Sequence, residues 1–498
     1  MWGHRRGGAK TDKNRVKSWA VVGLTALPSS TQTAEFYTKT GIFCFPSVRE
    51  FGEAVVLEVM TYGLLCIVAD NGGIAGYVTK KIGFKIASIP RENITCNAKM
   101  SNNLNLTILP SLQAKTLSNK QILIAQKFLD GVLKYVSLWP GSITVLMEEN
   151  TQKDNNLDNI NVRRDELPFK LEIISFDTIS TAELLNQTSV VLATVGYRQN
   201  HISKVCQSAG IPCIYISEYS LRTRKQIVAV TTRNPLLRLR RNLWEDAQES
   251  KQRKAVALAN GLQCNGTPTY NAYRTINCNP LLFFDTRVTE DMLTTNDDIE
   301  MRVRRQSKDM PLRLLFSGRL IKMKGADHLL DIAQELKRLG IRFQMFICGD
   351  GELKEMMQHN IAVNGLGDCV KMMGVLEFKT ELIPFVKANV DLFICCHRQG
   401  DPSCTYLETM SCGVPIVGYA NEAFAGIVEH SKIGWLVEMD RPKLLAKKVA
   451  ELSRDRERIK AMSFNSLRFA GLNTFEKTFE ARISHIERIA MSSSLSDK

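Results

Sequence analysis

The sequence of 498 residues has no apolar run of 18 or more residues, so it predicts no membrane-spanning helix. Its 13 cysteines are scattered without a CxxC pair, which predicts buried free thiols in a reducing compartment rather than disulfides or a zinc site. The basic N-terminus precedes only a short apolar run and no cleavage site, which argues against a secretory signal. These absences together predict a cytoplasmic protein.

Positive charge is what the sequence has in excess, with a formal net charge of +14. Such an excess suits nucleic acid, an anionic membrane surface or an anionic small substrate as a partner. The sequence has no interleaving of aromatic and basic residues, and no helix-turn-helix or RNA-binding signature. Nucleic acid is therefore not the expected partner.

The basic residues are concentrated in residues 222–254, where ten lysines and arginines stand against three acids. A helix here would be amphipathic, with apolar residues on one face, namely Leu236, Leu239, Leu243 and Trp244. Two interpretations stay open. The helix lies on anionic lipid, as a peripheral contact at the inner face of a membrane, or it is an ordinary surface helix whose apolar face packs on its own domain. We favour the second interpretation.

One stretch of the sequence occurs twice. Residues 391–420 read as an apolar strand, a polar loop, a short helix ended by glycine and a second strand, which is the unit that holds nucleotides beside parallel strands. Residues 41–78 repeat this pattern without a gap, so that Glu58 matches Glu408 and Gly76 matches Gly426. The chain is therefore predicted to contain two copies of one functional element.

The alternation of apolar strands with helical segments predicts an α/β fold, in which two Rossmann-like domains face a cleft behind an N-terminal partial Rossmann-like fragment. We place the fragment at 1–99, the first domain at 103–290, the second at 310–470 and a C-terminal helical segment at 471–498. The second domain shows a complete pattern of six strands. In the first domain, a helix is predicted over 118–135.

The chemistry is expected at the carboxyl ends of the strands in the second domain. Gly318, Arg319 and Lys324 follow its first strand, where a glycine allows close backbone approach and two cations can grip a diphosphate. Gly351 and Glu352 follow the second strand, where they border a nucleoside or simply form a turn.

Further candidates lie in the later copy of the repeated element. Glu408 falls in the first turns of its helix, where a carboxylate accepts hydrogen bonds from sugar hydroxyls or is simply favoured by the helix dipole. Cys404 and Thr405 come just before it and offer backbone N–H groups to a phosphate.

These motifs resemble the donor domain of GT-B glycosyltransferases of the large retaining family four, the glycosyl transferases group 1. The arginine and lysine that follow the first donor-domain strand in that family match Arg319 and Lys324. The family signature is two glutamates separated by seven residues. The second matches Glu408, whereas Gly400 stands in place of the first, with Asp401 as the nearest carboxylate.

The N-terminal copy keeps both signature glutamates, Glu50 and Glu58, but lacks the preceding strand with the arginine and lysine. We expect it not to bind a donor unaided. We interpret residues 1–99 as the remnant of a second donor domain, joined to a full enzyme that begins near Met100.

The resemblance implies a hexosyltransferase-type enzyme that moves a sugar from a nucleotide-sugar donor to a polysaccharide or lipid-linked acceptor, with retention of anomeric configuration. It implies no metal and no cofactor, because the cations and a helix terminus stabilise the leaving diphosphate. Asp401, Ser403, Cys404 and Thr405 are implied to contact the donor. Glu218 stands where many family members have a histidine near the reacting carbon. The last helix is implied to cross back onto the first, acceptor-side domain.

Two other functions stay open at this point. The missing first glutamate and the missing histidine suit a non-catalytic sugar-nucleotide-binding partner of a biosynthetic complex. A nucleotide-sugar epimerase shares the two-domain architecture and would convert the donor without an acceptor. The sequence identifies neither the nucleoside nor the sugar nor the acceptor.

Overall fold

The computed structural model describes residues 42–45, 65–69, 83–86, 104–117, 120–151, 159–178, 188–304 and 310–495. The chain forms two compact units, Met1–Met100 and Ser101–Lys498. Among the helices of these described residues, none is both long and apolar enough to cross a membrane.

The first unit contains a small parallel sheet in the order β1-β2-β3. Its strands are β1 (Ile42–Phe45), β2 (Leu65–Ala69) and β3 (Gly83–Ile86). Phe43 pairs with Cys66 in this sheet, and the matching residues of the later copy, Phe393 and Ile416, pair in the same register. The rest of the predicted first copy, including both of its signature glutamates, lies outside the described residues.

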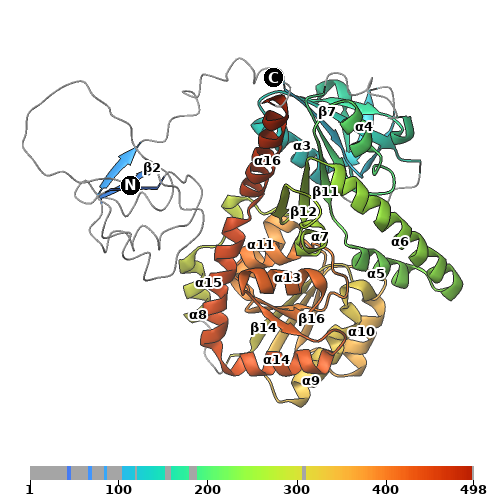
Figure 1. The fold of residues 1–498 in the computed structure, drawn as a ribbon. Coiled ribbons are helices and arrows are strands. Elements are labelled where there is room, and N and C mark those ends of the chain that lie inside the picture. The colour runs from blue at the N-terminus through green and yellow to red at the C-terminus, as the bar shows by residue number, and fades with distance from the viewer. Residues whose placement is uncertain are drawn as a thin grey trace, which may run out of the picture. The chain divides into compact units, whose positions relative to one another are not determined.

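The second unit consists of two lobes, each built on its own sheet (Figure 1). We call residues 104–288 the first lobe; its sheet has the order β13-β12-β11-β10-β4-β7-β5-β6-β8, and β9 pairs with β7. The strands are β4 (Asn105–Leu109), β5 (Gln113–Thr116), β6 (Gln121–Ala125), β7 (Ser142–Glu149), β8 (Asn159–Arg163), β9 (Lys170–Ile173), β10 (Val190–Thr194), β11 (Cys213–Ser217), β12 (Gly261–Asn265) and β13 (Pro280–Phe283). The helices are α3 (Gln126–Leu138), α4 (Ile202–Ser208), α5 (Leu221–Thr231), α6 (Pro235–Leu258) and α7 (Thr267–Tyr273).

The edge of the first-lobe sheet corrects one prediction. Residues 118–135 do not form a single helix, because β6 pairs antiparallel with β5 and β8, and α3 begins only at Gln126. Ile122 and Ile124 are buried, whereas their neighbours in β6 are more exposed. This alternation has the period of a strand, so burial against the sheet decides the local structure here.

We call residues 310–472 the second lobe. Its parallel sheet has six strands in the order β16-β15-β14-β17-β18-β19. They are β14 (Leu312–Ser317), β15 (Phe343–Cys348), β16 (Val370–Gly374), β17 (Leu392–Cys395), β18 (Ile416–Tyr419) and β19 (Trp435–Val437), and all six were predicted. The helices are α9 (Leu329–Arg338), α10 (Lys354–Val363), α11 (Ile383–Asn389), α12 (Thr405–Ser411), α13 (Glu422–Ser431), α14 (Pro442–Arg454) and α15 (Arg456–Leu472), and α8 (Asn296–Arg304) precedes the lobe.

Both faces of the second-lobe sheet are buried. Leu314 packs into the core on one face, whereas its neighbour Leu315 packs into the core on the other. Ile394 and Phe393 divide between the two faces in the same way, because successive side chains of a strand point to opposite faces. The nearly continuous apolar strands of this region are thus those of a parallel sheet covered on both sides.

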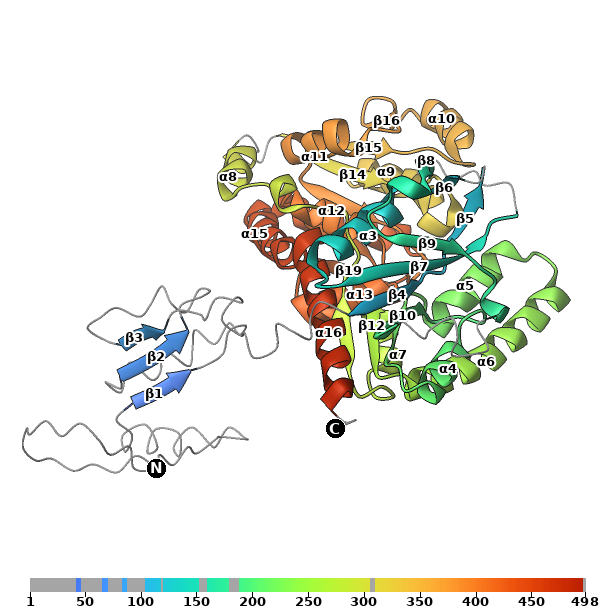
Figure 2. The ribbon, with the colours of Figure 1, turned by 90° about the horizontal axis from the view of Figure 1, so that it is seen from above.

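The last helix, α16 (Phe475–Leu495), packs on the first lobe (Figures 1 and 2). Phe479 and Ile486 are buried in the first-lobe core together with Val145 of β7. Arg482 of α16 and Gln263 of β12 exchange two hydrogen bonds of 2.9 Å. The end of the described chain therefore completes the core of the lobe with which this unit begins.

Candidate functional site

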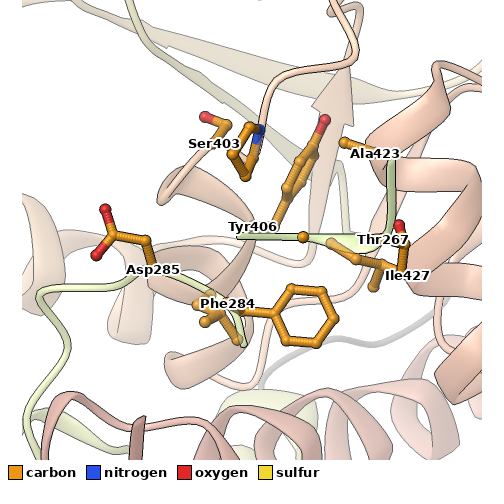
Figure 3. Close-up of a pocket in the computed structure, with 10 residues that line it drawn as sticks. Thr267, Phe284, Asp285, Ser403, Tyr406, Ala423 and Ile427 are labelled. Atoms are coloured by element: carbon orange, nitrogen blue, oxygen red, sulfur yellow. The ribbon is translucent and has the colours of Figure 1, made fainter. Parts of the chain in front are cut away.

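The loops that follow strands of both sheets meet between the two lobes. Ser220, after β11, donates a hydrogen bond of 2.7 Å to the carboxylate of Glu422, after β18. Thr223 donates one of 3.1 Å to the carbonyl of Gly400, after β17. Figure 3 shows a small cavity of about 10 Å³ at this junction, to which the first lobe contributes Thr267, Phe284 and Asp285 and the second lobe contributes Ser403, Tyr406, Ala423 and Ile427. Ligands of open α/β sheets bind outside the carboxyl ends of the strands, so the candidate site lies here.

The two cations predicted after β14 have different environments. Lys324 is buried, and its Nζ lies 3.1 Å from the carboxylate of Asp401. The side chain of Arg319 is exposed and forms no hydrogen bond or ion pair with any residue that the structure describes. Arg319 is thus open to an anionic ligand, whereas Lys324 is held against the carboxylate of Asp401.

A glycine brings Lys324 to this position. Gly325 has a φ of 69°, and a Cβ there would lie 2.1 Å from the carbonyl oxygen of Cys396, at the end of β17. Only a residue without a side chain allows this approach. The turn after β14 therefore packs directly on the start of the loop that carries Asp401.

The glycines after β14 and β15 also serve packing. A Cβ on Gly351 would lie 2.6 Å from the backbone oxygen of Leu320, and one on Gly349 would lie 2.0 Å from the oxygen of Gly318. The two loops are therefore in backbone contact, which accounts for these glycines without a ligand. Glu352, the other residue predicted to border a nucleoside, is exposed at the same edge.

Glu408 is held by a partner that no sequence motif indicated. Its Oε1 accepts a hydrogen bond of 2.7 Å from Nε of Arg287, at the end of the first lobe. The Arg287 guanidinium also stacks on Phe378, with Cζ 3.7 Å from the ring centroid. These two contacts fix the carboxylate in α12, while Oε2 forms no hydrogen bond with the described residues and can accept one from a ligand.

Cys404 lies in a cluster with two first-lobe groups that the sequence did not single out. Lys127 Nζ is 2.5 Å from Asp285 Oδ2 and 3.2 Å from the Cys404 sulfur. Burial opposes the charge of Lys127, but the carboxylate of Asp285 and the thiol together raise the lysine pKa. Burial, reinforced by Asp285, raises the pKa of the Cys404 thiol to about 11. Ser403 and Thr405 flank this cluster at the start of α12.

Glu218 and Tyr219, after β11, lie near charged groups of both lobes. Desolvation by the surrounding protein, reinforced by the negative charge of Asp285, raises the pKa of Glu218. Tyr219 is 41% exposed, and partial desolvation raises its pKa to about 12; Glu218 and Asp401 add to this effect, whereas Arg319 and Lys127 oppose it. Because Arg319 and Asp401 belong to the second lobe and Lys127 to the first, Tyr219 lies near charged groups of both lobes.

A cavity of about 340 Å³ in the first lobe opens next to Glu218, and we call it the first-lobe cavity. Glu218, Lys127, Asp285 and Arg482 bring charge to its wall. The rest of the wall is mainly apolar and includes Ile108, Leu109, Pro110, Leu112, Phe128, Val132, Leu192, Ile216 and Phe479. The Tyr135 hydroxyl in this wall is buried and has no hydrogen-bond partner among the described residues. The cavity can therefore hold an apolar group that ends in a polar one.

The basic segment 222–254 forms α5 and α6. In the predicted apolar face of α6, Trp244 packs edge-on against Tyr197 of the same lobe, but the three leucines do not pack on their own domain, so the favoured interpretation is wrong for them. Leu236, Leu239 and Leu243 are 76%, 58% and 62% exposed. The buried residues of α6, among them Ala255 and Val256, lie near its other end. The first half of α6 extends beyond the sheet that the second half covers, which leaves its leucines uncovered (Figure 1).

Ten cysteines whose side chains the structure describes are free thiols; seven of them are buried, as predicted, whereas Cys278 is exposed. Across the same residues, no group of three or more histidine, cysteine, aspartate and glutamate side chains could hold a metal ion. The expectation that no metal or cofactor is needed stays a prediction.

Two Rossmann-like lobes with facing strand ends, and a last helix on the first lobe, define the GT-B fold. Two solved structures share this architecture over 78% of the chain. One is an Anabaena protein crystallised in complex with UDP, with 14% identity, a TM-score of 0.51 and 99% of that chain covered. The other is sucrose-phosphate synthase from Thermosynechococcus elongatus, with 11% identity, a TM-score of 0.51 and 100% of that chain covered. At these identities the likeness shows the fold.

The second lobe matches the model of a known family. Residues 297–468 match the glycosyl transferases group 1. An amylovoran biosynthesis glycosyltransferase of Erwinia amylovora is 30% identical over 156 residues, which is 30% of this chain and 38% of that protein. A putative colanic acid biosynthesis glycosyltransferase of Salmonella typhimurium is 28% identical over 152 residues, 29% of this chain and 37% of that protein. The match thus spans little more than a third of the length of these relatives.

Proposed function

We propose that this chain is a retaining glycosyltransferase of the hexosyltransferase type, which moves a sugar from a nucleotide-sugar donor to an acceptor. The observation that carries the proposal is the match of the second lobe to the glycosyl transferases group 1, with Arg319 and Lys324 in place after β14. The names of the matched relatives, biosynthesis glycosyltransferases for amylovoran and colanic acid, support the same activity.

In this proposal the leaving group is a nucleoside diphosphate, whose negative charge grows as the bond to the sugar breaks. Arg319 and Lys324 stabilise that charge, a type of interaction that often contributes most to catalysis. Lys324 exchanges its Asp401 partner for the diphosphate, which frees that carboxylate for the donor sugar. Glu408, fixed by Arg287, offers its second oxygen to a hydroxyl of the donor.

The test of this proposal is turnover with a panel of UDP-glucose, UDP-N-acetylglucosamine and GDP-mannose. Release of nucleoside diphosphate is followed by mass spectrometry, and the anomeric configuration of the product is read by proton NMR. A product with the configuration of the donor supports retention, and an inverted product contradicts it.

A second candidate is a non-catalytic sugar-nucleotide-binding partner of a biosynthetic complex. The observation that favours it is the pairing of Lys324 with Asp401 and of Glu408 with Arg287, since both predicted ligand groups already have protein partners. Binding of a nucleotide-sugar without transfer or hydrolysis would support this candidate. An epimerase would instead convert the donor with no acceptor present.

We place the acceptor in the first-lobe cavity and assign it an apolar part, as in a lipid-linked glycan. The wall of that cavity is mainly apolar, whereas its charged groups gather near Glu218, towards the second lobe. A lipid or aromatic group would fill the apolar part and leave the reacting hydroxyl near Glu218. A purely hydrophilic polysaccharide would leave this apolar wall exposed to water.

Methyl, butyl and octyl glucosides test this placement, because they differ only in apolar length. Affinity should rise up to about fourfold per added methylene until the cavity is filled. Leu112→Asp introduces a charge into the wall and should abolish this gain, whereas Leu236→Asp, on an exposed leucine outside the cavity, should not. Equal affinity for the three glucosides would contradict an apolar acceptor site.

We also propose that α6 is a peripheral contact with an anionic membrane. Its exposed leucines lie beside exposed arginines, including Arg240 and Arg241. Apolar side chains flanked by cations suit the boundary between acyl chains and anionic headgroups. A lipid-linked acceptor would be met at such a surface.

A further inference from the structure

Position 400, where the family signature has a glutamate, has no room for a side chain. A Cβ on Gly400 would lie 2.8 Å from Cβ of Glu422 and 3.2 Å from Oγ1 of Thr223. The backbone cannot easily move away, because Gly400 N donates to Gln226 and its carbonyl accepts from Thr223, both at 3.1 Å. Glu422 therefore occupies the space that a glutamate at position 400 would need.

The N-terminal copy has glutamate and glycine exchanged at the two matching positions. In the N-terminal copy, Glu50 stands at the position that matches Gly400, and Gly72 stands at the position that matches Glu422. Each copy thus has one glutamate and one glycine at this pair of positions, and the two copies have them exchanged. A carboxylate lost from one position of the later copy is present at the other.

Glu422 is fixed at the junction of the lobes. It begins α13, and Asn421 caps that helix by accepting a hydrogen bond of 2.9 Å from the backbone N–H of Phe424. Oε2 of Glu422 accepts from Ser220 of the first lobe. Oε1 forms no hydrogen bond with any residue in the described part of the chain. A carboxylate accepts about four hydrogen bonds, so most of its capacity is open to a ligand with donating hydroxyls.

We propose that Glu422 supplies the carboxylate that Gly400 lacks, and that it accepts hydrogen bonds from hydroxyl groups of the donor sugar. This inference rests on the proposed glycosyltransferase function and names a further residue of its donor site. It makes Glu422 a determinant of which sugar is accepted, because a sugar without a correctly placed hydroxyl leaves the carboxylate unpaired.

Glu422→Gln tests this role, with Ser220→Ala as the matched control. Loss of charged hydrogen bonds to the sugar should lower kcat/KM for the best donor of the panel about 10- to 100-fold, with UDP affinity unchanged. Ser220→Ala removes the contact between the lobes together with the N-cap hydrogen bond that Ser220 accepts from the Thr223 N–H, and it should still change kcat/KM less than about threefold. If Glu422 served only to join the lobes, the two variants would behave alike and the inference would be overturned.

The double variant Gly400→Glu, Glu422→Gly tests the exchange of glutamate and glycine between positions 400 and 422. It reproduces the arrangement of the N-terminal copy. Gly400→Glu alone places two side chains in one space and should lose both thermal stability and activity. The double variant should regain at least tenfold in kcat/KM over that single variant. Failure to regain activity in a double variant that unfolds at the wild-type temperature would contradict the inference.

Different results would contradict the role of Glu422 and the proposed function. If the wild-type chain turns over a donor and Glu422→Gln matches it, only the role of Glu422 falls. If the wild-type chain neither binds UDP nor consumes any nucleotide-sugar of the panel, the proposed function falls and the role of Glu422 falls with it.

Discussion

At the scale of single residues, two of the charged groups predicted for the candidate site form ion pairs with other residues of the protein. Lys324 pairs with Asp401, and Glu408 pairs with Arg287. Buried ion pairs of this kind cost desolvation and are weak evidence for stability. These ion pairs instead hold each charged group in place beside the junction of the lobes.

Lys324→Ala should lower kcat/KM about 10²–10³-fold, because it removes a cation that stabilises the leaving diphosphate. Lys322→Ala is the matched control, since Lys322 is an exposed lysine of the same turn. It should leave kcat/KM within about twofold, because exposed charges are worth little. Steady-state assays with the best donor compare the two variants, and equal losses would contradict the role of Lys324.

The Cys404 thiol should resist alkylation at neutral pH. With its pKa raised to about 11, the thiol is protonated at pH 7.5, and its reactive thiolate increases about tenfold per pH unit until the pH approaches that value. Peptide mass spectrometry after iodoacetamide treatment measures this, with the exposed Cys278 as the internal reference. Alkylation of Cys404 at pH 7.5 as fast as that of Cys278 would contradict the burial described here.

The second-lobe side of the site could be predicted from the sequence, because Arg319, Lys324 and Glu408 each follow an apolar strand in a short motif. Arg287 could not, since it lies 121 positions from Glu408 in a segment without periodicity. Lys127 was also missed, because its partner Asp285 is 158 positions away. Contacts across the junction depend on how two sheets face each other, which no local pattern encodes.

At the scale of elements, local patterns again predict some features, whereas features that depend on distant contacts were missed. Every strand of the second-lobe sheet could be located, because each is a short apolar run bounded by turn residues. The β5–β6 hairpin was missed, since the burial of Ile122 and Ile124 depends on pairing with β8, more than 30 residues further along the chain. The exposure of the α6 leucines was missed because an amphipathic pattern does not say what covers the apolar face.

If α6 contacts membranes, the chain should sediment with vesicles of phosphatidylcholine and phosphatidylglycerol, and less with phosphatidylcholine alone. Replacing both Leu239 and Leu243 by serine should weaken this binding at least about tenfold, because it removes two apolar side chains from the lipid. Added salt should weaken it as well. Leu472→Ser, on an exposed leucine of α15, is the control and should bind like the wild type. Equal binding of the double variant would contradict the contact.

At the scale of the whole molecule, the chain has two compact units that meet in sequence at Met100 and Ser101. The GT-B fold, with both lobes and α16, lies entirely within the second unit. The described residues of the candidate site all belong to the second unit. The second unit therefore contains every group to which the proposed function assigns a role.

Deleting residues 1–100 should leave thermal unfolding of the remaining chain within about 2 °C of the same transition in the full chain. Donor turnover should also persist, because the cations and carboxylates of the site remain. Calorimetry and the turnover assay on the full and shortened chains measure both. A shortened chain that is insoluble, or that is folded but inactive, would contradict the view that the first unit is a remnant.

The most direct test of the central claim is donor consumption by the full chain. We would incubate the purified protein with the nucleotide-sugar panel and octyl glucoside, and follow nucleoside diphosphate and glycoside product by mass spectrometry. The account predicts that one donor yields equal amounts of nucleoside diphosphate and glycosylated octyl glucoside, and that Lys324→Ala abolishes both. Binding of UDP with no donor consumed, or consumption that Lys324→Ala leaves unchanged, would contradict it.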